Sequence, residues 1–267
     1  MIRIGTAGYS YRDWVGPFYP PGTKGEDMLS YYAKEFPFVE LNSSYYRMPN
    51  RHMLWNMQAK TPHGFLFAVK AHRSITHQED TGPGAYEEFR EALSPLAAEG
   101  KLACVLAQFP HSFRCTEANR SFLRALRDGM GDLPVVVEFR HQSWIREGTM
   151  ELLRQQQLGF VCVDEPDLKG LVRPVVACTG PVAYVRFHGR NADRWWDHRE
   201  SFERYNYLYL EEELREWLPR IRVLSSGSKK LFISFNNHYQ GQAIRNGRMM
   251  RALLTSFGGG SFPKDVE

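Results

Sequence analysis

The chain has 267 residues, of which 43% are hydrophobic and 24% charged, and its formal net charge is +4. This composition is ordinary for a globular protein and leaves ample apolar material for a core. No apolar run approaches the ~20 residues that span a bilayer, and the N-terminus enters a strand-like segment without the apolar core of a signal peptide. We therefore expect a cytoplasmic protein with no membrane partner.

Short apolar runs alternate with amphipathic segments along the chain. The runs that we interpret as strands are Ile2–Thr6, Phe38–Asn42, Phe65–Lys70, Leu102–Gln108, Val135–Arg140, Phe160–Asp164, Ala183–His188 and Leu231–Asn236. The segments that we interpret as helices are Gly25–Phe36, Arg51–Lys60, Tyr86–Ala98, Glu117–Arg127, Arg146–Gln157, Leu210–Leu224 and Gln242–Phe257. This alternation predicts βαβ units and an α/β fold, a (β/α)8 TIM-type barrel forming one domain over residues 1–267. An open doubly wound sheet is the alternative.

Two segments depart from a regular barrel. Glu165–Pro181, between the sixth and seventh strands, contains two internal prolines, so we expect a weak sixth helix. Gly189–Tyr209, after the seventh strand, is too long for a simple connection, and we expect a long insertion with a functional or lid role. Asn50 and Thr116 precede two of the predicted helices as N-caps.

The segment Val135–Trp144 is the most informative of the sequence. It begins as an apolar run, typical of a strand buried on both faces, and ends in a carboxylate, a guanidinium, an imidazole and an indole. Active sites of such barrels lie at the carboxyl ends of the strands, and residues two apart share a face. These rules predict a ring of polar strand-end side chains at one mouth: Glu40, Asn42, Lys70, Gln108, Glu138, Arg140, Asp164, Arg186, His188, Ser234 and Asn236.

The charges in this ring balance, which leaves two interpretations open. Glu40, Lys70, Glu138 and Arg186 form either a catalytic centre or a structural ion-pair network. The loops near the same mouth interleave aromatic rings with arginines, a pattern that suits unstacked bases with phosphates as well as sugar rings. These loop residues are Tyr9, Tyr11, Trp14, Tyr45, Tyr46, Trp144, Trp195, Trp196, Tyr205, Tyr207 and Tyr209, with Arg12, Arg47, Arg190, Arg194, Arg199 and Arg204.

Cofactor motifs are weak or missing in the sequence. The four cysteines form no C-x-x-C pair, and the sequence has no H-E-x-x-H, G-x-S-x-G or Walker A pattern. The segment Gly5–Gly8 is a poor phosphate cradle. We expect no cofactor, with a divalent metal held by Glu138, Asp164 and His188 as the alternative.

Several segments resemble the YecE-like family, which has a domain of unknown function numbered 72. The matching segments are Gly5–Tyr11, Phe18–Pro20, Val39–Arg47, Phe67–Lys70, Val137–His141, Tyr184–Arg190 and Phe235–His238. The resemblance implies a TIM-type barrel and no established reaction. It also implies similarity to the barrels of endonuclease IV and the xylose-isomerase-like enzymes, an analogy of fold that does not fix function. We cannot map the multi-zinc ligand set of endonuclease IV onto this sequence.

The sequence favours a hydrolase-like or lyase-like enzyme that binds a phosphate-bearing ligand, a nucleic acid or a nucleotide, at the barrel mouth. The expected catalytic residues are Glu138, His188, His141 and Asp164, which would transfer protons or orient the histidines. The expected ligand-binding residues are Asn42, Tyr46, Lys70, Arg140, Trp144, Arg186, Arg190, Asn236 and Asn237. The alternatives are a non-enzymatic module that binds nucleic acid or protein, and a carbohydrate-active enzyme using Glu138 and Asp164. The pattern indicates no particular oligomeric state.

Overall fold

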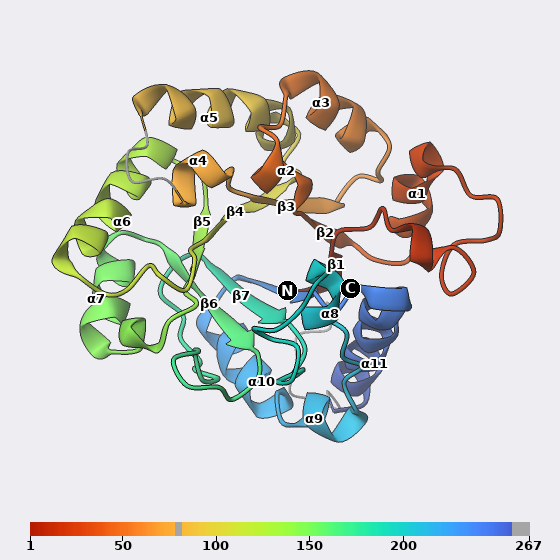
Figure 1. The fold of residues 1–267 in the computed structure, drawn as a ribbon. Coiled ribbons are helices and arrows are strands. Elements are labelled where there is room, and N and C mark those ends of the chain that lie inside the picture. Colours follow the sequence, from red (N-terminus) through yellow and green to blue (C-terminus); the bar gives the residue numbers. More distant parts are fainter. Residues whose placement is uncertain (78–81, 258–267) are drawn as a thin grey trace.

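Eight parallel strands close into a barrel in a computed structural model that describes residues 1–77 and 82–257 (Figure 1). Each strand pairs with the next in sequence, and β8 returns to β1. The strands are β1 Ile2–Ala7, β2 Phe38–Leu41, β3 Leu66–Lys70, β4 Leu102–Gln108, β5 Val135–Glu138, β6 Gly159–Asp164, β7 Val182–Phe187 and β8 Lys230–Phe235. Every predicted strand is present within two residues of its predicted bounds, and the (β/α)8 prediction is confirmed.

The larger helices lie around the outside of the barrel (Figure 1). The helices are α1 Gly25–Tyr32, α2 Ser43–Tyr46, α3 Arg51–Ala59, α4 Arg73–Thr76, α5 Pro83–Ala98, α6 Glu117–Met130, α7 Glu147–Gln155, α8 Ser201–Arg204, α9 Glu211–Arg215, α10 Leu218–Gly227 and α11 Gln242–Phe257. The two predicted N-caps are confirmed, because Asn50 accepts a hydrogen bond from the Met53 amide and Thr116 from the Asn119 amide. No helix in the described part of the chain combines the length and the apolar character needed to cross a bilayer.

The structure corrects one predicted helix and refines the two irregular segments. The single helix expected over Leu210–Leu224 is divided into α9 and α10, because Pro219 lies in the first turn of α10 and cannot continue a helix from α9. The weak sixth helix expected within Glu165–Pro181 is absent: residues 165–181 contain no helix, because their two internal prolines interrupt any helical run, and irregular chain joins β6 to β7. The insertion between β7 and α9 contains the short helix α8.

Side chains fill the barrel interior in layers. Phe38 of β2, Tyr184 of β7 and Phe232 of β8 are fully buried, and their ring centroids lie 4.9–6.2 Å apart. The next inward-facing positions on β2 and β7, two residues further along, are Glu40 and Arg186. The apolar layer therefore forms a floor on which the first charged layer of the mouth rests.

Candidate functional site

Glu40 and Arg186 form a bidentate ion pair inside the barrel. Arg186 donates from Nε to Glu40 Oε2 at 3.0 Å and from Nη2 to Oε1 at 2.6 Å. The hydroxyl of Tyr184 also donates to Oε2 at 2.9 Å. All three side chains are buried, so both oxygens of Glu40 are satisfied where water has no access.

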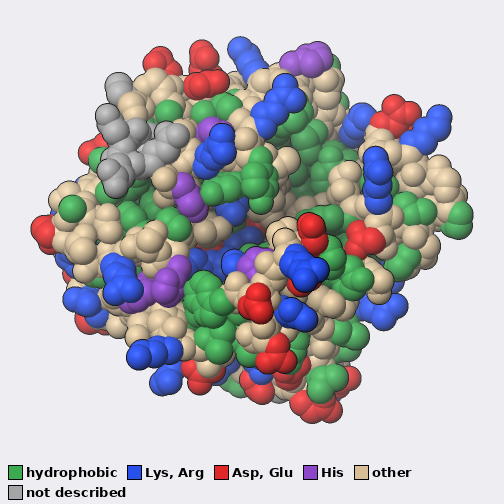
Figure 2. Space-filling model, viewed as in Figure 1, with side chains coloured by type: hydrophobic (Ala, Val, Ile, Leu, Met, Phe, Trp, Pro, Cys, Tyr) green, Lys and Arg blue, Asp and Glu red, His purple; other side chains and the backbone are tan. Residues whose placement is uncertain are grey.

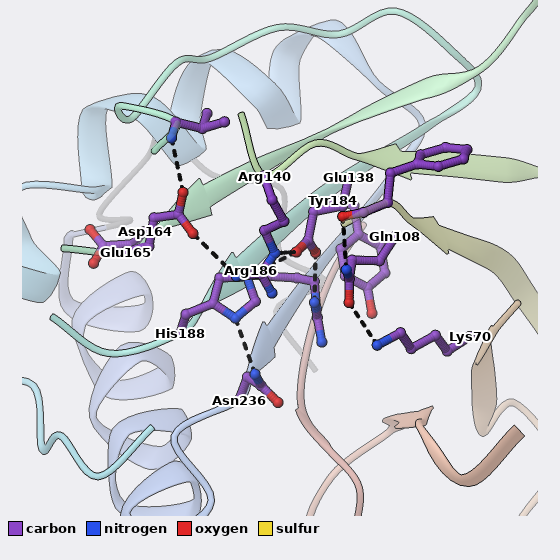
Figure 3. Close-up of polar contacts among 12 residues, drawn as sticks. Lys70, Gln108, Glu138, Arg140, Asp164, Glu165, Tyr184, Arg186, His188 and Asn236 are labelled. Carbon is purple, nitrogen blue, oxygen red and sulfur yellow. Dashed lines mark hydrogen bonds and ion pairs between the residues drawn. The ribbon is translucent and has the colours of Figure 1, made fainter. Parts of the chain in front are cut away.

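Glu138, at the end of β5, lies between two guanidinium groups (Figure 3). Its Oε2 is 2.6 Å from Arg186 Nη1, and its Oε1 is 2.5 Å from Arg140 Nε. Burial opposes ionisation of this carboxyl, but Arg140 and Arg186 hold its pKa well below the ordinary value. Glu138 is therefore an ionised carboxylate that positions two arginines.

His188 completes this group as a neutral ring. Burial, followed by the charge of Arg140, lowers its pKa to about 3. Its Nδ1 lies 3.1 Å from Asn236 Nδ2, and its Nε2 lies 3.2 Å from Glu138 Oε1 (Figure 3). With Nδ1 accepting from Asn236, the proton is on Nε2 and faces Glu138. Within the described residues, Glu138 Oε1, Arg140 Nε and His188 Nε2 make close contacts without an aligned hydrogen bond.

A cavity of about 380 Å³ lies over this cluster. Figure 2 shows a hollow near the middle of this face, with Lys and Arg side chains gathered in and around it. The lining residues are Tyr11, Asn42, Tyr46, Lys70, Gln108, Arg140, Arg186, His198, Ser201, Arg204, Tyr205, Asn236 and His238. Four of the thirteen are Lys or Arg and none is Asp or Glu, so the acidic side chains lie behind the cations and the cavity surface is cationic.

A second cavity of about 220 Å³ adjoins the first and shares Gln108, Arg140, Arg204 and Tyr205 with it. Its remaining lining residues are His77, Pro110, His111, Leu171, Trp195 and Trp196. Arg204 lies at the junction, where its Nε donates to the Trp195 carbonyl at 2.8 Å and its guanidinium lies 5.4 Å from the Trp195 ring. The insertion thus supplies an aromatic wall to a continuous hollow.

Comparison with known proteins places the chain in a family. A family model described as "Protein of unknown function DUF72" matches residues 3–264. The chain belongs to the DUF72 family. The DUF72 relative YunF of Bacillus subtilis, a UPF0759 protein, is 34% identical over all of this chain and 99% of its own length. YecE of Escherichia coli K12, also a UPF0759 protein, is 29% identical over 57% of this chain and 53% of its own length.

Two solved DUF72 structures share the fold. The protein from Thermotoga maritima superposes with a TM-score of 0.89 at 40% identity, over 96% of this chain and 99% of its own. The protein from Enterococcus faecalis superposes with a TM-score of 0.84 at 27% identity, over the full length of both chains. The resemblance expected from the sequence motifs is confirmed.

The DUF72 barrel mouth does not gather all the expected site residues in the cavity. Those that line the larger cavity are Asn42, Tyr46, Lys70, Arg140, Arg186 and Asn236. Trp144 is instead stacked between Phe113 and Phe139, and its Nε1 donates to the Phe113 carbonyl. Asn237 donates from Nδ2 to the Tyr207 carbonyl and to Asn246. Both side chains pack parts of the DUF72 fold together outside the cavities.

Asp164 and Arg190 form a separate cluster at the base of the insertion. Arg190 binds both Asp164 oxygens, from Nε at 2.9 Å and Nη2 at 2.8 Å. Tyr209 donates to Oδ1 and the Trp217 indole to Oδ2, each at 2.7 Å. Neither Asp164 nor Arg190 lines either of the two cavities described above. The expected catalytic carboxylate and phosphate ligand instead anchor the insertion to β6.

The ring of His141, the other expected proton-transfer residue, contacts neighbouring protein groups. Its Nδ1 accepts a hydrogen bond from the Ser143 amide, and its ring lies 4.9 Å from that of His111. Burial lowers its pKa, as do Arg114 and His111. His111 lines the smaller cavity, whereas His141 is not among its lining residues.

Glu165 is a site residue that the sequence reasoning missed. It follows β6, and its Oε2 lies 3.2 Å from Arg140 Nη1 while its Oε1 accepts from the Val172 amide at 3.0 Å. Burial raises its pKa to about 7 despite Arg140. The sequence feature that could have identified Glu165 is its position beside Asp164, at the start of a segment without a helix. The cavity residues Arg204 and Tyr205 did have a signal, the interleaving of aromatic rings and arginines in the insertion.

The arrangement of side chains does not favour the alternative prediction of a divalent metal site at Glu138, Asp164 and His188. In residues 1–77 and 82–257, no group of three or more His, Cys, Asp or Glu side chains is arranged to hold a metal ion. Glu138 lies beside His188 but is paired with two arginines, and both oxygens of Asp164 are bound in a separate cluster with Arg190, so the three side chains do not form one ligand set.

Proposed function

We propose that the protein is a lyase-like or hydrolase-like enzyme whose cavity binds a phosphate-bearing ligand, a nucleotide or the end of a nucleic acid strand. The observation that carries the proposal is the lining of the larger cavity, with four cations and no carboxylate. A ligand of opposite charge is the natural occupant of such a surface.

The guanidinium groups keep donors for this ligand. Arg140 contacts Glu138 through Nε and Glu165 through Nη1, which leaves Nη2 for a phosphate oxygen. Arg204 is bound through Nε to a backbone carbonyl, which leaves both of its terminal nitrogens. Because Glu138 and Glu165 hold the Arg140 guanidinium and the Trp195 carbonyl holds that of Arg204, little side-chain entropy is lost on binding.

The aromatic residues supply stacking surfaces beside these cations. Tyr11 and His238 are stacked at 4.5 Å with an interplanar angle of 4° on one side of the cavity. Tyr46 and Trp196 are 72% and 52% exposed, which leaves their ring faces accessible. A flat base held between rings with its phosphate on arginines is a recurrent mode of single-strand and nucleotide recognition.

A binding module without turnover is the second candidate. Two observations favour it: the buried carboxylates are ion-paired with arginines, and His188 is neutral and buried. The same contacts weaken the carbohydrate alternative. Glu138 has a lowered pKa and cannot serve as a general acid, and Asp164 lies in another cluster.

Fluorescence anisotropy of labelled single-stranded, duplex and abasic oligonucleotides, titrated at several salt concentrations, tests the proposal. We expect binding that weakens steeply with salt, because phosphate contacts release counterions. Arg204→Ala should lower affinity about tenfold, the value of one charge-assisted contact. Arg199→Ala, an exposed residue of the same insertion outside both cavities, is the matched control and should bind within about twofold of wild type. Equal losses in the two variants, or no binding at low salt, would contradict the proposal.

A further inference from the structure

Lys70, at the end of β3, is an enclosed amine without a carboxylate beside it. Its Nζ donates to Gln108 Oε1 at 2.7 Å (Figure 3). The same nitrogen lies 4.5 Å from the ring centroid of Tyr45. Within the described residues, its hydrogen-bond partner is a neutral amide. The same side chain lines the larger cavity with Arg140 and Arg186.

The amide of Gln108 is neutral, and a second hydrogen bond fixes its orientation. Gln108 Nε2 donates to the Phe109 carbonyl at 2.9 Å, which fixes Oε1 toward Lys70. Burial lowers the pKa of Lys70 to about 7, with Arg186 and Arg140 adding to the effect and Glu138 and Glu40 opposing it. At neutral pH much of this side chain is therefore the free amine, the nucleophilic form.

Lys101, a second enclosed lysine in the described part of the chain, shows the contrast. Lys101 donates from Nζ to the carbonyls of Gln58 and Thr61 and to the Thr61 hydroxyl, at 2.7–3.1 Å. These three acceptors occupy the ammonium group, and Lys101 lines neither cavity. Lys101 ties segments of the fold together, whereas Lys70 faces the hollow.

We propose that Lys70 is a nucleophile that forms an imine with the carbonyl carbon of a phosphate-bearing aldehyde or ketone. The inference rests on the proposed function, since Arg140, Arg186 and Arg204 would hold the phosphate of the same molecule. The amine lone pair forms the new C–N bond, and the carbonyl oxygen leaves as water with the two amine hydrogens. No oxidant or reductant is needed. The protonated imine withdraws electrons from the adjacent carbon, which is the activation that a lyase-type bond cleavage requires.

Trapping with borohydride tests this proposal. The protein is incubated with stoichiometric pyridoxal 5′-phosphate, reduced with sodium borohydride, and mapped by peptide mass spectrometry. We expect the adduct on Lys70 at least about tenfold ahead of the exposed lysines Lys24 and Lys34, with a rate that is half-maximal near pH 7. Labelling of Lys70 no faster than that of these surface lysines would overturn the proposal.

Two further arms separate this inference from the proposed function. Pyridoxal, which lacks the phosphate, should label Lys70 about tenfold more slowly. Equal rates for the two aldehydes would overturn the phosphate-bearing substrate class together with the proposed function. Lys70→Met should lose the adduct. Salt-dependent oligonucleotide binding by the wild type without any adduct on Lys70 would overturn the imine alone and leave the proposed function standing.

Gln108→Glu tests the positioning role of the amide. The new carboxylate would lie where the amide oxygen contacts Lys70 and would favour the ammonium form. The pH at which Lys70 labelling is half-maximal should then rise by about one unit or more, with labelling restored at higher pH. An unchanged pH profile would show that the neutral partner does not control the amine.

Discussion

Two arginine–carboxylate clusters lie at the same end of this barrel and use their donors differently. The Glu138 cluster consists of Glu40, Glu138, Arg140, Arg186 and His188, and three of its buried atoms make close contacts without an aligned hydrogen bond. In the Asp164 cluster of Asp164, Arg190, Tyr209 and Trp217, both carboxylate oxygens accept two aligned hydrogen bonds of 2.9 Å or less.

The comparison shows that the same residue types can have different roles, one structural and one in ligand binding. In the Asp164 cluster the hydrogen-bonding capacity of the carboxylate is used up within the fold, which suits an anchor. In the Glu138 cluster two arginines border the cavity, and Arg140 retains a terminal nitrogen that a ligand can use. A site for chemistry is therefore expected where buried polar groups are paired incompletely.

Removing the shared arginine of the Glu138 cluster should have the largest effect. Arg186→Met leaves Glu40 and Glu138 buried beside an apolar side chain, and we expect a loss of about 3–5 kcal/mol in the free energy of unfolding. Urea denaturation measures the loss. Arg248→Met, which breaks a partly exposed bidentate pair with Glu35, is the control and should cost under about 1 kcal/mol. Similar losses of unfolding free energy in the two variants would show that the buried cluster stabilises the fold no more than the exposed pair does.

Asp164→Asn should have the next largest effect. One oxygen becomes an NH2 group that faces existing donors, and we expect a cost of about 2–3 kcal/mol. Hydrogen exchange should show faster exchange confined to residues 189–209, since the insertion loses its anchor. The control is Asp167→Asn, whose pair with Arg173 is 79% exposed on both sides and should be silent. Unchanged exchange in the insertion would mean that Asp164 does not anchor it.

Glu165→Gln should change the pH dependence of stability. The folded-state pKa of Glu165 is raised to about 7, so the folded protein holds a proton that the unfolded chain has released above its ordinary pKa of 4.5. Its contribution is fully present below pH 4.5 and is lost as pH rises through 7. Wild type should therefore lose about 2 kcal/mol relative to the variant between pH 4.5 and 7.5. Parallel stability curves from denaturation at several pH values would contradict this assignment.

Trp196→Ala should have the smallest effect on stability. The ring is 52% exposed, so we expect a change within about 0.5 kcal/mol in the free energy of unfolding. The affinity for single-stranded oligonucleotide should nevertheless fall by about 1–3 kcal/mol, the value of one stacked base. A variant with full affinity would remove the smaller cavity from the proposed binding surface.

The fold was predictable because its signals are local and repeated. Apolar runs ending in polar residues located all eight strands, and the caps at Asn50 and Thr116 marked two helix starts. Pro219 lies within the helix predicted over Leu210–Leu224, and that prediction did not include the break between α9 and α10.

The site was only partly predictable because its pairing depends on distant segments. Glu138 and Asp164 both end strands and look alike in sequence, yet one borders the cavity arginines and the other is enclosed by residues 26–53 positions away. Trp144 follows β5 as a ligand-stacking residue would, but Phe113 and Phe139 enclose it from either side. The neutral environment of Lys70 likewise depends on Gln108, a residue of another strand.

Barrel closure joins the two ends of the sequence, since residues of β1 pair with residues of β8. Glu40 is similarly 146 positions from its partner Arg186. At a synthesis rate of about 5–20 residues per second, β8 follows β1 from the ribosome by roughly 10–50 seconds. Over that interval the edge of β1 that pairs with β8 has no partner, and Glu40 lacks Arg186 until β7 has been made. The charged layer inside the barrel mouth therefore forms only when the last third of the chain has been made.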